Sequence, residues 1–248
     1  MKKVKYLLYR ILGLKTYLLL ISNVYINYIK LGLGKKKFQE IHYLEKIIKP
    51  GFYCIDIGAN VGYFSFFMSK YCGNGGKVIA VEPVKVFSEI WEKNVRKTKK
   101  NNAVLCQYAL GEENKEVKMG MPVVDGGIHH GMTKIISQGD NSYEKLFDVN
   151  MRIPDELFKD IEKIDFVKID VEGYENIVFN NMRETLSKYK PLIQSELGGE
   201  YNREESIRIL SELSYEPYIL QNDSLIKISS GEIKNYNRDF YFKVDPSK

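Results

Sequence analysis

The chemistry-bearing residues of this 248-residue chain begin with the pattern Asp56-x-Gly58-x-x-x-Gly62, which directly follows the apolar run 52–55. The apolar run predicts a buried strand, and the two glycines predict a tight turn that leads into a helix. Ligands of open α/β sheets sit at the carboxyl ends of such strands, so the turn is a candidate binding site. A carboxylate at this position favours a cationic amine over a pyrophosphate, which Asp56 would repel.

A second acidic residue, Glu82, ends the next predicted strand, 24 residues after Gly58. A carboxylate at this place can accept hydrogen bonds from both hydroxyl groups of a ribose. The glycine spacing differs from the G-x-G-x-x-G of dinucleotide-binding proteins. Asp56 and Glu82 together therefore predict a ligand that carries both an ammonium group and a ribose.

A third set of candidate residues, Lys168, Asp170 and Glu172, alternates at the end of the predicted strand 164–169. Alternating residues of a strand share one face, so we expect these three at the carboxyl edge of the sheet, near the reactive end of the ligand. The two acids are candidate catalytic bases. Two other interpretations stay open: capping of the following helix, or binding of a divalent cation together with Glu196. The spacing of the acids is irregular, and we assign no metal site.

Residues 120–145 hold five glycines and the pair His129 and His130, without a pattern typical of helix or strand; a short strand is expected before them at 115–119. Long loops of this kind commonly bind a ligand or close over one. Because histidine titrates near neutral pH, either ring could act as the general base toward a hydroxyl group, and His130, which precedes Gly131, is favoured. A solvated loop in which the histidines have no role is the open alternative.

The remaining apolar patterns predict an alternation of strands and helices. Strands are expected at 77–82, 103–108, 191–194, 215–220 and 238–244, and helices at 38–48, 61–71, 84–95, 178–189 and 207–213. Alternation of this kind is typical of an α/β sheet with parallel strands.

Four segments occur in a fixed order: DIGANVGYFS (56–65), VIAVEP (78–83), ALG (109–111) and FVKIDVEGYE (166–175). In these segments, and over about residues 50–200, the chain resembles the FkbM family of S-adenosylmethionine-dependent methyltransferases. The resemblance implies S-adenosyl-L-methionine as cofactor and a class I methyltransferase Rossmann-like fold. That fold has a mostly parallel seven-stranded sheet, helices on both faces and an antiparallel closing strand. The implied cofactor contacts are Asp56, Gly58, Ala59, Asn60, Gly62, Tyr63, Glu82 and, beside the adenine ring, Ala109.

The resemblance also bears on the methyl acceptor. Base and protein amine methyltransferases of this fold often carry an Asn/Asp-Pro-Pro-aromatic tetrapeptide, whereas this chain has Asp170-Val-Glu-Gly in that place. We therefore expect O-methylation of a small-molecule, sugar or glycan hydroxyl. Two alternatives stay open: a nitrogen methyltransferase acting on nucleic acid or protein, and a membrane-surface binding protein that kept the fold.

The N-terminal arm, residues 1–37, is expected to precede a methyltransferase domain at 38–248. Residues 1–39 hold nine Lys or Arg and no acid, which leaves 28 basic and 32 acidic residues in an acidic body that argues against a nucleic-acid partner. The longest uncharged run, 16–29, is shorter than the roughly 20 apolar residues of a spanning helix.

Two interpretations of the arm are open. The arm either contacts anionic lipid peripherally or packs as a helix on the domain or on a second copy in a homodimer. Three cysteines without a C-x-x-C pair indicate a reducing compartment. We expect a cytoplasmic protein, at the inner face of the membrane if the arm binds lipid.

Overall fold

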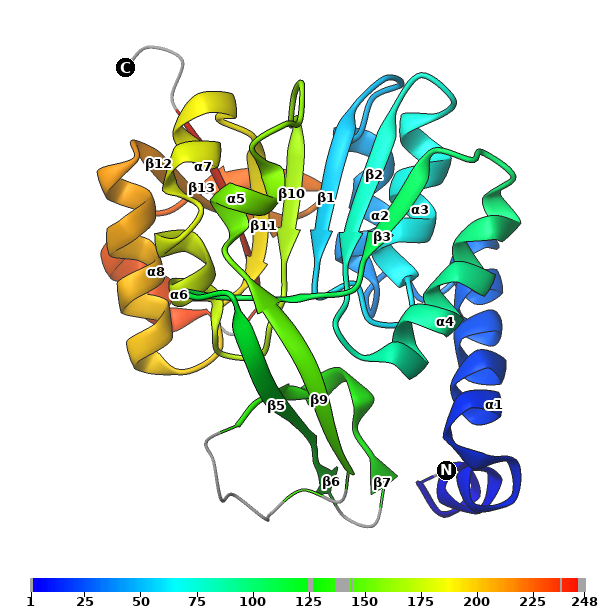
Figure 1. Ribbon diagram of the computed structural model, residues 1–248. Helices are drawn as coiled ribbons and strands as arrows, with labels where there is room; N and C mark the ends of the chain where they lie inside the picture. The colour runs from blue at the N-terminus through cyan, green and yellow to red at the C-terminus, as the bar shows by residue number, and fades with distance from the viewer. Residues whose placement is uncertain (1, 125–126, 137–142, 144, 237, 245–248) are drawn as a thin grey trace.

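A mostly parallel sheet forms the centre of the protein in a computed structural model that describes residues 2–124, 127–136, 143, 145–236 and 238–244 (Figure 1). Its eight strands follow the order β13-β12-β14-β11-β10-β1-β2-β3, and the strands from β11 to β3 are parallel. β14 is antiparallel to β11 and β12, and β13 is antiparallel to β12. The strands are β1 (Tyr53–Ile57), β2 (Lys77–Val81), β3 (Ala103–Cys106), β10 (Phe166–Ile169), β11 (Leu192–Glu196), β12 (Tyr215–Gln221), β13 (Ser224–Lys227) and β14 (Asp239–Val244).

Helices cover both faces of this sheet (Figure 1). Cys54 of β1 faces a cluster formed with α2 and α3, while its neighbours Ile55 and Ile57 face a cluster formed with α5 to α8. A parallel strand that is covered on both faces is apolar along its whole length, which explains the continuous apolar run that precedes Asp56. The helices are α2 (Gln39–Ile47), α3 (Tyr63–Cys72), α4 (Lys85–Val95), α5 (Pro154–Phe158), α6 (Glu175–Asn180), α7 (Arg183–Tyr189) and α8 (Glu200–Glu212).

The α/β class predicted from the sequence agrees with this topology, but the sheet has eight strands instead of seven. The additional strand, β13, is a largely exposed edge strand, so its residues carry no apolar pattern that could announce it. The single helix predicted over 178–189 is divided into α6 and α7, because Asn181 and Met182 lie between them in non-helical conformations.

An antiparallel ribbon projects from the carboxyl edge of the main sheet (Figure 1). It pairs β5 (Lys115–Met121), which contains the predicted short strand, with β9 (Lys145–Arg152), which the sequence did not indicate. β4 (Ala109–Leu110) and β8 (Lys134–Ile135) complete a small sheet of four strands.

The expectation that 120–145 has no secondary structure of its own is therefore wrong for the described part of this segment. Besides β8, the segment holds β6 (Val123–Val124), β7 (Gly127–Ile128) and the 3₁₀ turn His130–Met132. Residues 125–126, 137–142 and 144, which the predicted loop also included, lie outside the described residues.

The N-terminal arm is a helix, α1 (Lys2–Lys30), which is broken at Gly13, where φ is 72° and ψ is 166°. Its part after Gly13 packs on the main domain, with Leu18, Ile26 and Ile29 buried. The Leu7–Lys30 part is long and apolar enough to cross a bilayer by length and composition, with a mean hydropathy of 1.3. Core helices of soluble proteins and signal sequences meet the same criterion.

Candidate active site

The glycine turn after β1 forms the floor of a cavity at the carboxyl edge of the sheet. The cavity has a volume of about 190 Å³ and is enclosed by the turn, by Glu82, by residues 108–110 and by the ribbon. Gly58 has a φ of 75°, and a Cβ atom there would lie 1.9 Å from the carbonyl oxygen of Asp170. Only glycine therefore allows the end of β1 to lie this close to the end of β10.

Gly62 makes the second close approach of the turn, at the start of α3. Its φ is 88°, and a Cβ atom would lie 2.9 Å from Cδ1 of Trp91. The glycine therefore allows α3 to pack directly on α4, as the sequence pattern predicted.

Asp56, the first acidic residue of the pattern, is fully buried beneath this cavity. Its Oδ2 accepts a hydrogen bond of 2.5 Å from the Ser65 hydroxyl, whose oxygen in turn accepts one of 2.7 Å from the indole N–H of Trp91. Its Oδ1 has no hydrogen-bond partner within the described residues. Burial raises the pKa of Asp56, and the positive charge of Lys168 and the Ser65 hydrogen bond oppose that rise. A buried acceptor without a donor fits an ammonium group of the bound cofactor.

Glu82, at the end of β2, is held by two backbone N–H groups. Its Oε2 accepts from the N–H of Asn60 and its Oε1 from the N–H of Val84, both at 2.8 Å. Burial raises the pKa of Glu82 to about 7, against the lowering effect of these two hydrogen bonds. Each carboxylate oxygen keeps a second lone pair, so the fixed carboxylate fits a ribose with two hydroxyl donors.

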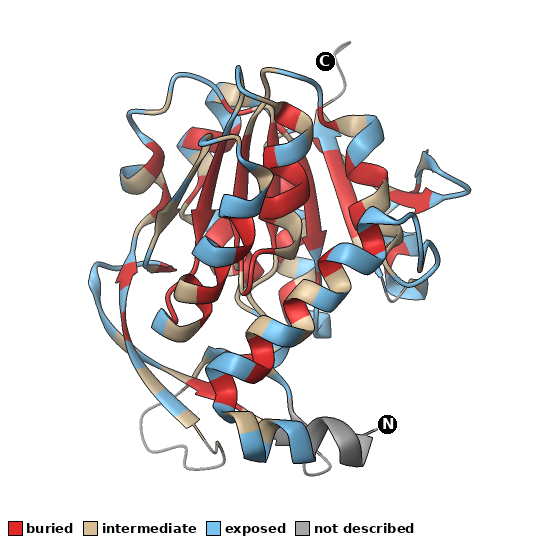
Figure 2. Cartoon of the chain, turned by 90° about the vertical axis from the view of Figure 1, so that its right-hand side faces the viewer, coloured by how far each residue is buried: buried red, intermediate tan, exposed pale blue. Residues whose placement is uncertain are grey.

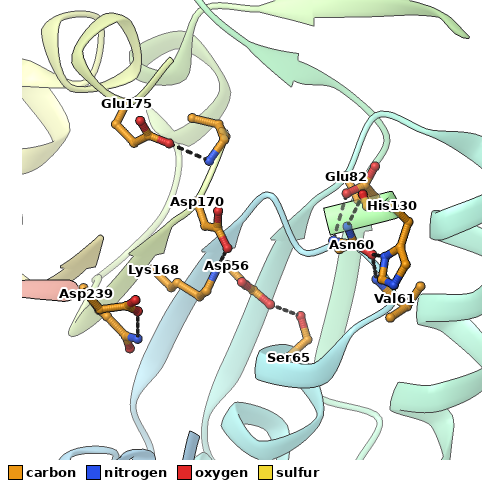
Figure 3. A network of polar contacts seen from close by, with 12 residues as sticks. Asp56, Asn60, Val61, Ser65, Glu82, His130, Lys168, Asp170, Glu175 and Asp239 are labelled. Atoms are coloured by element: carbon orange, nitrogen blue, oxygen red, sulfur yellow. Dashed lines mark hydrogen bonds and ion pairs between the residues drawn. The ribbon is translucent and has the colours of Figure 1, made fainter. Parts of the chain in front are cut away.

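Asn60 connects the cofactor turn to the acceptor-side segment (Figure 3). Its side-chain Oδ1 accepts from the N–H of Val61 and lies 2.9 Å from Nδ1 of His130, while its Nδ2 donates to the His130 carbonyl at 3.1 Å. Because an amide oxygen can only accept, the Nδ1 of a neutral His130 ring carries the proton, and Nε2 is the basic nitrogen. This arrangement brings His130, which is 70 residues away in the chain, onto the rim of the cavity.

Lys168 and Asp170 form a separate polar pair on the side of β10 (Figure 3). Lys168 is 3% exposed, and its ammonium group lies 3.0 Å from Oδ2 of Asp170. Burial lowers the pKa of Lys168, but the carboxylates of Asp170 and Asp56 outweigh burial and raise it. Lys168 therefore stays charged and neutralises acid beneath the reactive end of the cavity.

The expectation that Glu172 continues the strand face of Lys168 and Asp170 is wrong. β10 ends at Ile169, and Glu172 has a φ of 55°, so the chain has already turned. Glu172 nevertheless lines the cavity. Burial, with the nearby charges of Asp170 and Glu196, raises its pKa to about 8. A carboxyl group with such a pKa is a much stronger base than an unperturbed one.

The capping interpretation applies to another acid, Glu175. Its carboxylate accepts from the backbone N–H groups of Val171 and Gly173 and from the side chain of Asn202. Glu175 is thereby committed to holding the turn after β10. Within the part of the chain that the structure describes, no group of three His, Cys, Asp or Glu residues is placed to hold a metal ion.

The structure brings most of the predicted site residues to one cavity. Besides those described above, Ala59, Tyr63 and Ala109 line it, whereas the exposed His129 does not. Sequence reasoning missed the lining residues that the ribbon and its neighbours supply, and no local motif identifies them: Phe87, Tyr108, Met119, Thr133, Ile135 and Tyr174.

A second hollow of about 530 Å³ continues from the acceptor side of the cavity. The two share Ile135, Asp170, Glu172 and Tyr174, and the second adds Glu196, Glu200 and Tyr201. The reactive end of the cavity therefore opens onto a groove lined by carboxylates and two tyrosines.

Comparison with known proteins gives three kinds of match. The family model described as the methyltransferase FkbM domain matches residues 56–223, more than half of the chain. A curated ribosomal RNA large subunit methyltransferase E of Wigglesworthia glossinidia brevipalpis is 34% identical over 87 residues, 29% of this chain and 43% of that protein.

Two solved structures share the fold. A methyltransferase FkbM of Methylobacillus flagellatus KT has a TM-score of 0.51 at 14% identity, covering 82% of this chain and 50% of that one. A putative rRNA-methylase of Clostridium thermocellum has a TM-score of 0.50 at 10% identity, covering 84% and 94%. The chain thus spans half or less of the curated relative and of the first of these structures.

Proposed function

Because this chain belongs to the FkbM family of S-adenosylmethionine-dependent methyltransferases, we propose that it methylates a hydroxyl oxygen of a sugar, glycan or related metabolite. The bound cofactor supplies an activated methyl group and its own leaving group, so the protein chiefly positions the acceptor. Glu82 would hold the ribose, Asp56 the amino group, and Ala109 the adenine side of the cofactor.

The acidic groove that continues from the cavity is the observation that supports a hydroxylated acceptor. Asp170, Glu172 and Glu196 line it within reach of the acceptor side. Carboxylates accept hydrogen bonds from neutral hydroxyl groups, and Tyr174 and Tyr201 offer flat surfaces for a sugar ring. The same carboxylates repel the phosphates of a nucleic acid.

His130 and Glu172 are the two candidate bases on this side. The Asn60 hydrogen bond leaves Nε2 of His130 as the nitrogen that can take the hydroxyl proton, which makes His130 the first choice. Glu172, with a pKa of about 8, is the second. A positioned base of this kind typically contributes a factor of about 10²–10⁴ to the rate.

A methyl-transfer screen tests the proposal. Labelled cofactor is incubated with a panel of neutral glycans and nucleotide-free sugars on one side and with unmodified ribosomal RNA on the other. We expect alkali-stable methylation of a hydroxylated acceptor, and His130→Ala should lower turnover about 100-fold with nearly unchanged cofactor affinity. His129→Ala is the matched control and should leave turnover unchanged. Methylation of ribosomal RNA alone would reject the hydroxylated small-molecule or glycan acceptor.

The relatives that are named ribosomal RNA methyltransferases motivate that second arm of the screen. If His130→Ala and His129→Ala both turn over normally, the base role passes to Glu172 or Asp170. The corresponding Glu172→Gln variant then decides between these two carboxylates.

A further inference from the structure

The outward face of α1 after its break carries a continuous apolar stripe. Leu20, Val24, Tyr28 and Leu31 are 46%, 59%, 41% and 75% exposed. At 100° per residue they fall within an arc of about 80°, which is one side of the helix. In Figure 2, where α1 crosses the front of the molecule, exposed residues recur along its outer side.

The opposite side of α1 is fixed to the domain. Leu18, Ile26 and Ile29 are buried, and the Asn94 amide donates at 2.8 Å both to the Ser22 hydroxyl and to the carbonyl of Val61, in the cofactor turn. The stripe is therefore presented by a docked helix with a definite orientation.

The exposed apolar surface continues on the segment before the break. Leu7 and Ile11 are 59% and 69% exposed. The inner residues of this segment, Tyr9 and Leu12, pack with Met121 of the ribbon, so the segment lies at the end of the molecule from which the ribbon projects (Figure 1).

The charges around the stripe identify its partner. Lys30, Lys35 and Lys36 are exposed at its C-terminal end, and residues 1–39 contain nine basic residues and no acid. We propose that the outer face of α1 docks peripherally on an anionic lipid surface, with the leucines and valine in the headgroup boundary and the lysines on lipid phosphates. Apolar side chains and basic residues on one helix face are the combination that binds such surfaces.

Two other occupants fit the surface less well. A two-fold contact between copies through α1 would bring two uniformly basic arms together, which like-charge repulsion disfavours. A spanning α1 would have to leave the domain and expose its apolar partners in α3, including Phe66 and Phe67.

Binding of the full chain to vesicles tests this proposal. Wild-type protein should sediment with phosphatidylcholine vesicles that contain about one third phosphatidylserine, should bind pure phosphatidylcholine far less, and should be released by salt. The double variant Val24→Glu/Leu31→Glu should bind the anionic vesicles at least about tenfold more weakly. Alkaline carbonate should extract the bound protein.

The matched control is Val104→Glu/Ile226→Glu, which changes charge and apolarity equally at 47% and 45% exposed positions on the two edge strands of the sheet. This control should bind vesicles as the wild type does, and both variants should keep the wild-type melting temperature and cofactor affinity. Three results would overturn the proposal: no binding by the wild type, equal loss in both variants, or resistance to carbonate extraction, which would mean a spanning helix. A dimer seen by light scattering that only the α1 variant dissociates would assign the face to a second copy.

Discussion

The affinity for the cofactor should depend on pH through Glu82. This carboxyl group has a pKa raised to about 7 in the free protein, chiefly by burial. Ribose hydroxyls donate hydrogen bonds, so the ionised form is the one that binds both of them. Binding should therefore release a proton, and affinity should rise with pH until Glu82 is ionised.

The size of the effect follows from the same pKa. If only the ionised form binds, the apparent dissociation constant at pH 6 is about tenfold larger than at pH 8, and about half a proton is released at pH 7. Isothermal titration calorimetry with the demethylated cofactor measures both quantities. Repeating each titration in two buffers of different ionisation enthalpy gives the proton count.

The matched variant is Glu82→Gln, which is neutral at every pH and similar in size. Its amide NH₂ would face a backbone N–H of Asn60 or Val84, so affinity should fall by about 1–3 kcal/mol at pH 8. Its affinity should also become independent of pH between 6 and 8. Asp56 has a raised pKa as well, and for that reason the slope that remains in Glu82→Gln is the decisive number. A flat profile in the wild type, or an unchanged slope in the variant, would refute the assignment of Glu82 to the ribose.

Three further predictions concern the frame of the site. Ser65→Ala removes the donor to Asp56 and leaves a buried carboxylate without it, so thermal unfolding should show a loss of about 1–3 kcal/mol, and an unchanged melting temperature would contradict this. Gly58→Ala places a Cβ atom 1.9 Å from the Asp170 carbonyl oxygen, so calorimetry should find no cofactor binding in any folded protein recovered; normal binding would mean that the two strand ends separate freely. Asn94→Ala breaks both bonds that join α1 to the cofactor turn, so hydrogen exchange should quicken in α1 and in that turn, whereas exchange that changes in neither would show that apolar packing alone holds the helix.

The cofactor half of the site could be predicted from the sequence because its determinants are local. Strands buried on both faces appear as apolar runs, and the residues at their carboxyl ends, Asp56 and Glu82, meet at one edge by the rules of parallel sheets. The four ordered segments then indicated the family, and the family match confirms that prediction. The cofactor predicted with it, S-adenosyl-L-methionine, follows from the same match.

The acceptor half could not be predicted in the same way. β9 and the short strands of the ribbon have no apolar period that separates them from loop, and the ribbon brings Met119 and Ile135 into the cavity only through tertiary packing. The positive φ of Glu172 turns this residue off the strand face, which an argument from alternation cannot foresee. Exposed edge strands such as β13 are silent for the opposite reason, since nothing packs on them.

Asn60 is the residue at which the two halves of the site become one unit. Its backbone N–H holds Glu82 at the ribose end, and its side chain holds both the ring and the carbonyl of His130 at the acceptor end. It does so in a left-handed conformation, with a φ of 49°, which asparagine tolerates better than most residues. Any displacement of the turn that shifts Glu82 must also shift His130. The chain can therefore align its candidate base against the reacting centre only when the same turn is seated around the cofactor.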